Sequence, residues 1–271
     1  MSLRAIAAAI ALTLLLWGSL YALQRGSGFY QRRSQAYEDE MQNPSDDPPD
    51  AYEEGEFVFA RLRYRSPGRG FYRGSWGTDS NKAERVFLTG LRRLTQVHTR
   101  SVEQIVDIDS DEIFEWPWLY AVEVGYWELS DAQAKRLREY FDRGGFLMVD
   151  DFHGSWEWGA FTDGLRKVFP ERPVVELADE AAIFHTLYNL DERFQVPGRR
   201  FIRSGRTFEQ DGVQPRWRAI FDENGRVQVA ICHNMDLGDA WEWADDPRYP
   251  ERFTALAYRI GINYIVYAMT H

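Results

Sequence analysis

Short apolar runs alternate with stretches of helical periodicity over residues 56–271. Strands are expected at residues 57–64, 102–108, 119–124, 146–149, 217–221 and 227–231, and helices at 86–94, 130–143, 160–169 and 253–267. Asn81 is the expected N-cap of the first helix, and Ser130 with Gln133 three residues on indicates a capping box at the second. Such alternation implies parallel strands joined by right-handed crossovers. The dipeptide Asn224-Gly225, between the last two strands, is instead a hairpin signal. The pattern therefore predicts an α/β fold with a mostly parallel sheet and one antiparallel hairpin.

The N-terminal part of the chain has a different character. Residues 5–23 are uncharged and mostly apolar, which is long enough to cross a bilayer, and no small-residue cleavage site follows them. We therefore expect residues 1–24 to be a transmembrane anchor or signal sequence, with an uncleaved anchor favoured. Residues 25–55 are acidic and contain three prolines, which is typical of a flexible tether. The expected arrangement is a single pass through the inner membrane, with the domain of residues 56–271 in the periplasm.

Composition narrows the classes of partner. A net charge of -10 argues against nucleic acid, because phosphate backbones require a basic surface. The single cysteine, Cys232, permits no internal disulfide, and we expect it to be a buried structural residue rather than a nucleophile. An aromatic content of 15%, with ten tryptophans, either fills a core or lines a sugar-binding groove.

Two predicted strands, 146–149 and 227–231, each end in a group of acidic and imidazole side chains. These side chains are Asp150, Asp151, His153, His233, Asp236 and Asp239. Ligands of open α/β sheets bind at the carboxyl ends of the strands, so this group is the expected pocket. It offers ligands for a divalent cation and groups for acid–base catalysis, but aspartates of this kind also cap helices and order loops. The sequence does not decide among these three interpretations.

In the catalytic interpretation, Asp151 or Asp236 is the general base and His153 or His233 is the proton donor. Asp150 and Asp239 then contribute to ligand binding.

Three further residues are candidates for ligand binding. Arg63, near the end of the first strand, could bind a carboxylate or phosphate of a ligand, or it could neutralise Asp150 or Asp151 in an ion pair within the fold. Glu123 ends the third predicted strand, and Trp241 could stack on a sugar ring or pin a loop to the core. No cofactor or metal is identified by the sequence.

Several motifs together resemble a known bacterial family. They are FVFARLRY from Phe57, DIDSDEIFEWPWLY from Asp107, GGFLMVDDFHGS from Gly144, VFPERP from Val168 and DLGDAWEWAD from Asp236. In these motifs the chain resembles the domain of unknown function 4159 over residues 57–271. The resemblance implies a flavodoxin-like three-layer sandwich, similar to class I glutamine amidotransferases, in a protein that is exported or attached to a membrane.

Amidotransferase activity is not expected to follow from that resemblance. A glutamine amidotransferase needs a cysteine on the sharp turn after a central strand. The corresponding turn here holds Asp150, Asp151, Phe152 and His153.

The sequence leaves two functions open, together with a purely structural role. The first is a membrane-anchored, exported domain that binds a ligand or protein partner in the bacterial cell envelope. The alternative is an envelope hydrolase that acts on a carbohydrate or peptidoglycan-like substrate through an Asp/His site. Whether the protein is an enzyme stays undecided at this point.

Overall fold

The computed structural model describes residues 37, 40–42, 44–51, 53–66 and 76–271. Within these residues, one sheet contains strands in the spatial order β2-β1-β3-β4-β7-β6-β5. The strands are β1 Ala60–Arg63, β2 Gln104–Asp107, β3 Trp118–Val122, β4 Phe146–Asp150, β5 Val175–Glu176, β6 Arg216–Phe221 and β7 Val227–His233. The strands from β2 to β7 in this order are parallel, whereas β6 is antiparallel to β7 and β5 is antiparallel to β6.

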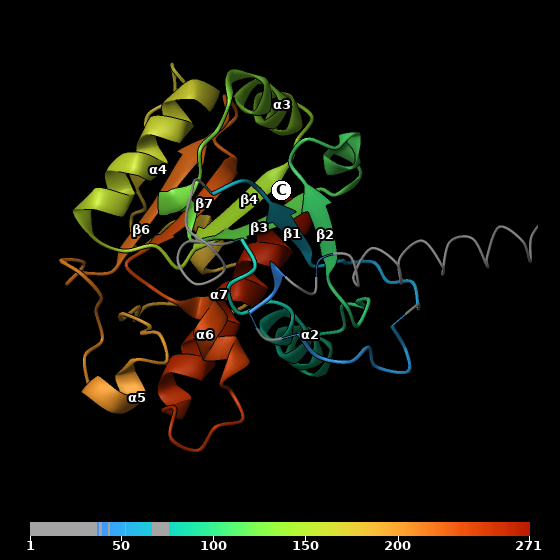
Figure 1. Cartoon of the computed structure of the whole chain (residues 1–271), viewed down its shortest axis with the longest axis vertical. Helices are drawn as coiled ribbons and strands as arrows, with labels where there is room; N and C mark the ends of the chain where they lie inside the picture. The colour runs from blue at the N-terminus through green and yellow to red at the C-terminus, as the bar shows by residue number, and fades with distance from the viewer. Residues whose placement is uncertain (1–36, 38–39, 43, 52, 67–75) are drawn as a thin grey trace, which may run out of the picture. The chain divides into compact units, whose positions relative to one another are not determined.

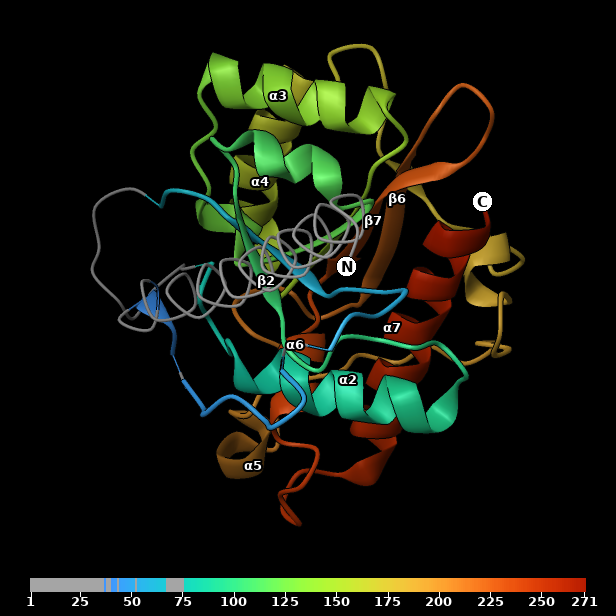
Figure 2. The ribbon, with the colours of Figure 1, turned by 90° about the vertical axis from the view of Figure 1, so that its right-hand side faces the viewer.

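Helices cover both faces of the sheet. The α-helices are α2 Lys82–Leu94, α3 Asp131–Asp142, α4 Gly154–Val168, α5 Phe201–Ser204, α6 Leu237–Glu242 and α7 Glu251–Thr270. Short 3₁₀ helices occur at η2 Asp111–Glu115, η3 Val124–Tyr126 and η4 Ala182–Phe184. Helices α3 and α4 lie on one face, and α2, α6 and α7 lie on the other (Figures 1 and 2). The predicted α/β fold with a mostly parallel sheet and an antiparallel hairpin is thus confirmed.

The central strands are apolar because both of their faces are covered. Every residue of β4 and β7 is buried. Between the sheet and α2, the rings of Phe59, Trp118 and Tyr120 form edge-on and stacked pairs, and Phe87 packs against Trp241 with ring centroids 4.5 Å apart. Each fully buried side chain of this size contributes about 1.5–3 kcal/mol to folding.

Capping explains where some helices begin. The predicted capping box of α3 is confirmed, because the Ser130 hydroxyl accepts a bond from the Gln133 amide and the Gln133 side chain bonds back to Ser130. Asn81, expected to cap α2, makes no such bond. Its side-chain amide instead donates to Glu103, and its oxygen accepts from the backbone of Ser45. That correction follows from long-range partners, which outcompete the local cap.

Part of the predicted tether is described by the structure, and it lies against the domain. Arg63, Arg85 and Arg92 form ion pairs with Glu40, Asp47 and Asp50, respectively. The expected anchor, residues 1–24, lies outside the described residues. Among the helices of the described part, none has the length and apolar character needed to span a bilayer.

The strand order reverses at one point in the sheet. The chain runs outward from β1 to β2 and then returns to β3 on the other side of β1. The loops after β1 and β3 therefore leave the carboxyl edge in opposite directions, and sheets of this kind bind their ligands at such a point.

Candidate functional site

The two strand ends that were predicted to form a site are neighbours. Strand β4 pairs in parallel with β7, with Val149 opposite Ile231. Beyond the strands, the Asp151 amide donates to the Met235 carbonyl at 3.1 Å, and the Asn234 amide donates to the Phe152 carbonyl at 3.0 Å. These bonds hold the two polar loops together at one edge of the sheet.

Asp150 supports the interior of this edge. Its side chain is fully buried, and Oδ2 accepts bonds from the amides of Leu237 and Gly238 and from the hydroxyl of Tyr120, at 2.6, 3.1 and 3.1 Å. Burial raises the pKa of Asp150 to about 7, although these hydrogen bonds act in the opposite direction. Because its Oδ2 is occupied by α6 and β3, Asp150 positions the first turn of α6.

Three other aspartates converge at the same edge of the sheet. Asp79, Asp151 and Asp236 each offer a carboxylate oxygen, and these oxygens all lie within 4.8 Å of one another. The three side chains follow β1, β4 and β7, and they are only 2%, 7% and 5% exposed. We call this group the aspartate triad.

The aspartate triad holds unfavourable electrostatic energy. Burial raises the pKa of all three carboxyls well above the ordinary aspartate value, and the neighbouring carboxylates raise it further. Oδ2 of Asp79 is buried and has no hydrogen-bond partner among the described residues. Arg61 acts favourably on Asp79, but its guanidinium is bound to Glu84 and to the carbonyls of Trp76 and Thr78. A bound cation would supply the missing positive charge.

Backbone conformation adds a second sign of specialisation at this edge. Asp79, Glu123 and Asp151 have φ angles of 61°, 54° and 50°. Residues other than glycine adopt this left-handed region infrequently, and such residues concentrate at functional sites. Asp151 lies on the turn between β4 and α4, where its carboxylate is one of the three in the aspartate triad.

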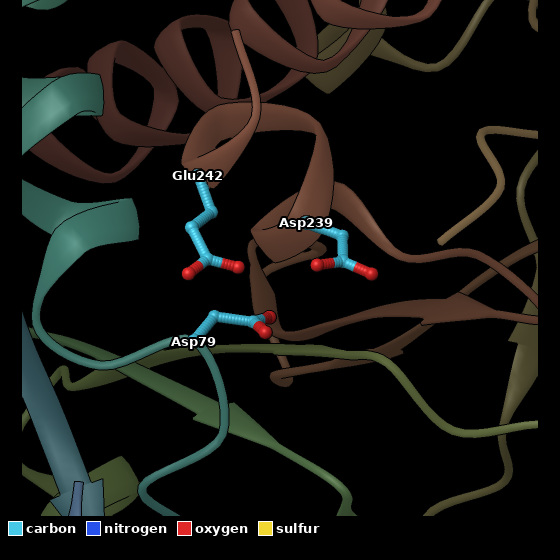
Figure 3. Close-up of side chains that lie close together, drawn as sticks. All are labelled: Asp79, Asp239 and Glu242. Carbon is cyan, nitrogen blue, oxygen red and sulfur yellow. The ribbon is translucent and has the colours of Figure 1, made fainter. Parts of the chain in front are cut away.

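A second group of carboxylates shares Asp79. Asp239 and Glu242 of α6 point toward Asp79, as Figure 3 shows, and one oxygen from each of the three lies within 4.8 Å of the others. Asp239 is partly exposed and already accepts bonds from the Arg199 amide and the Trp243 indole, at 2.5 and 3.0 Å. Its oxygens are therefore less available to a ligand than those of the aspartate triad.

The two predicted histidines have different surroundings. His153 lies with Nε2 3.2 Å from Oδ1 of Asp151, and its Nδ1 is buried without a partner among the described residues. Burial lowers the pKa of His153, so this ring is neutral at neutral pH. His233 instead bonds Gly154 and Arg218 and packs on aromatic rings, which indicates a structural role.

Of the three other predicted ligand-binding residues, only Glu123 lies beside the aspartate triad. Glu123 lies beside Asp151, because its amide donates to the Asp151 carbonyl and the Asp151 carboxylate raises its pKa, after burial as the main cause. Arg63 forms ion pairs within the fold, but its partners are Glu40 and Asp107 and not the expected Asp150 or Asp151. Trp241 is completely buried. The predicted ligand-stacking role of Trp241 is corrected accordingly, since α6 turns its ring toward the core instead of the surface.

Cys232 is fully buried and burial raises the pKa of its thiol, in keeping with a structural residue.

Sequence reasoning missed Asp79 and Glu242. In the sequence, Asp79 follows a glycine-rich stretch after the first predicted strand, and in a doubly wound fold the connection after a strand begins at the carboxyl edge. Glu242 lies three residues after Asp239, and this spacing brings the two to one side of a helix.

Chemically, the assembled site consists of oxygen ligands with one imidazole beside them. Carboxylate oxygens suit hard cations such as Mg²⁺ and Ca²⁺. The fold and site thus define an α/β domain with an acidic carboxyl edge.

Residues 58–269 match the model of the domain of unknown function 4159, and the chain belongs to this family. A search of curated proteins finds no match to the chain.

Proposed function

We propose that this protein is a membrane-anchored ligand-binding domain of the bacterial cell envelope, whose ligand includes a divalent cation held by Asp79, Asp151 and Asp236. The observation on which the proposal depends is that Asp79, whose Oδ2 is buried without a hydrogen-bond partner among the described residues, offers a carboxylate oxygen within 4.8 Å of oxygens from the other two carboxylates. Leaving a buried carboxylate oxygen unpaired is costly, and the cost is removed when a cation binds.

Fold-level similarity supports the same location for the site. The parallel strands have the order β2-β1-β3-β4-β7, which is the flavodoxin-like arrangement that class I glutamine amidotransferases also use. In that comparison, Asp151 stands on the turn where an amidotransferase would need its cysteine. The domain therefore lacks the amidotransferase nucleophile and presents a carboxylate in its place.

The location in the envelope is part of the proposal and depends on the N-terminal sequence. Residues 1–24 are proposed to be a single membrane span in the inner membrane, with residues 56–271 in the periplasm.

One contact favours a second candidate function, hydrolysis of an envelope carbohydrate or peptidoglycan-like substrate. His153 is 3.2 Å from Asp151, so a neutral imidazole stands next to the proposed cation ligands. An imidazole in this position could transfer a proton to or from a substrate.

Thermal unfolding of the full-length protein, with and without Mg²⁺ or Ca²⁺, tests cation binding. A cation that binds only the folded state at one hundred times its Kd stabilises that state by about 2.7 kcal/mol. We expect this stabilisation in the wild type and its loss in Asp236→Asn. The exposed Asp163, which pairs with Arg166 on α4, provides the control variant Asp163→Asn. Equal melting with and without both cations would reject the proposal.

A further inference from the structure

A cavity of about 270 Å³ is lined by residues of the segment from Pro197 to Gln210, which includes α5. Its wall contains three arginines, Arg200, Arg203 and Arg206. No acidic residue occurs from Arg199 to Arg206, although the chain as a whole has a net charge of -10. The lining also contains one carboxylate, Glu209, so three arginines face one acidic residue and the cavity carries an excess of positive charge.

The three arginines are not all neutralised by the fold. Arg200 pairs with Glu209 at 2.6 Å, and Arg206 lies over the ring of Phe208. The side chain of Arg203 has neither a hydrogen bond nor an ion pair within the described part of the chain, and it is exposed. Arg203 is thus available to bind an anion.

The cavity also borders the carboxylates of the candidate site. Gly198 lines the cavity, and a Cβ at this position would be 2.5 Å from Oδ2 of Asp236 and 3.0 Å from Oδ2 of Asp239. The next residue, Arg199, donates its amide to Asp239. A ligand in the cavity is consequently separated from the carboxylates by a residue without a side chain.

We propose that this cavity binds the phosphate group of a phosphorylated small molecule, next to the divalent cation. The cation belongs to the proposed function, on which this part of the inference rests, whereas the arginine cavity is an independent observation. A guanidinium binds phosphate through two parallel hydrogen bonds, and a phosphate carries about two negative charges, which suits more than one arginine. Protein-bound Mg²⁺ is commonly held by one or two carboxylates together with the phosphate of a substrate.

The volume restricts the size of the ligand. Cavities for drug-sized molecules begin at about 300 Å³, so 270 Å³ accommodates a phosphate with a small organic group.

The test is a calorimetric titration of the full-length protein with inorganic phosphate and with glycerol phosphate, each in the presence and absence of Mg²⁺. A hydrogen bond to a charged group contributes about 1.5–3 kcal/mol, so Arg203→Ala should weaken phosphate binding by about tenfold or more. Arg203→Lys keeps the positive charge but lacks the planar guanidinium, so its affinity for phosphate should lie between those of the wild type and Arg203→Ala. Arg259, exposed on α7, provides the matched control Arg259→Ala, which should bind phosphate like the wild type.

The outcomes separate this inference from the proposed function. Phosphate binding that depends on Arg203 supports the cavity assignment, even in a protein that binds no Mg²⁺. Conversely, Mg²⁺ binding without any phosphate binding overturns the inference and leaves the cation site intact. Equal weakening by Arg203→Ala and Arg259→Ala also overturns it, because the effect would then be general electrostatic attraction.

Discussion

Acidification should destabilise the folded domain through His233. This side chain is 5% exposed, and its pKa is lowered from 6.5 to about 4, mainly by burial and also by the charge of Arg218. Its hydrogen bonds are consistent with a neutral ring, because Nε2 lies 3.1 Å from the Gly154 carbonyl and Nδ1 lies 3.1 Å from the Arg218 guanidinium. A second ring proton would point at a guanidinium that is itself a donor.

The sign of the effect follows from proton uptake. The unfolded chain protonates His233 near pH 6.5, whereas the folded domain does so only near pH 4. Between these values the unfolded state binds more protons, so stability falls as the pH falls. A pKa difference of about 2.5 corresponds to about 3 kcal/mol in total, of which about 2 kcal/mol is lost by about pH 5.

Urea unfolding of the wild type and His233→Gln, followed by tryptophan fluorescence from about pH 7.5 to about pH 5, measures this contribution. The substitution should cost stability at neutral pH, because the ring packs on Phe152 and Trp158 with centroids 4.8 and 4.9 Å away. That cost should shrink by about 2 kcal/mol toward pH 5 as the wild type loses stability. The raised pKa values of the aspartate triad act with the opposite sign in both proteins, so the difference between them isolates His233. Parallel pH curves for the two proteins would refute the reasoning.

Three further changes have defined outcomes. Arg61→Met should destabilise the domain by about 3–5 kcal/mol in urea unfolding, because it leaves the fully buried Glu84 without its cation. A second change, Glu84→Leu, should restore most of the lost stability. No gain in stability from the second change would contradict this account. Gly198→Ala should lower the free energy of unfolding by about 1–3 kcal/mol and weaken Mg²⁺ binding in calorimetry, since the added Cβ meets a carboxylate oxygen of Asp236 at 2.5 Å. Unchanged stability and affinity would contradict this, because the backbone at residue 198 would then move away from Asp236 without cost. Deletion of residues 1–24 should transfer the protein from the membrane pellet to the supernatant after cell fractionation, and a full-length protein already in the supernatant would argue against the anchor.

The strand ends were predictable because hydrophobic pattern alone defines buried strands. The apolar runs before Asp150 and His233 correspond to β4 and β7, and the alternation of elements correctly indicated parallel pairing between them. Local signals were also sufficient for α3, where Ser130 and Gln133 interact within one turn.

The start of α4 was not predictable in the same way. The helix begins at Gly154, whereas the sequence suggested a loop up to residue 159. Its first amides bond to Asn234 and Asp211, which are about 80 and 56 residues away in the sequence. No local sequence pattern predicts such caps, because their partners lie in β7 and the neighbouring loops and come close only in the folded domain.

The same limit applies to the site. Asp79 comes to Asp151 and Asp236 through the crossover that follows β1, so its role depends on strand order and not on any neighbouring residue. Trp241 shows the converse, because its neighbours in the sequence are acidic while its ring packs on Phe87 and Tyr120.

Calorimetric titration of Mg²⁺ into the full-length wild type, Asp79→Asn and Asp163→Asn tests the cation site most directly. The wild type and Asp163→Asn should bind Mg²⁺ alike. Asp79→Asn should bind at least about tenfold more weakly, since it replaces a carboxylate, one of whose oxygens has no hydrogen-bond partner among the described residues, with an uncharged amide. Without Mg²⁺, the Asp79→Asn domain should be more stable than the wild type, because repulsion within the aspartate triad is relieved. Absence of Mg²⁺ binding by the wild type, or equal affinity in all three proteins, would contradict the account.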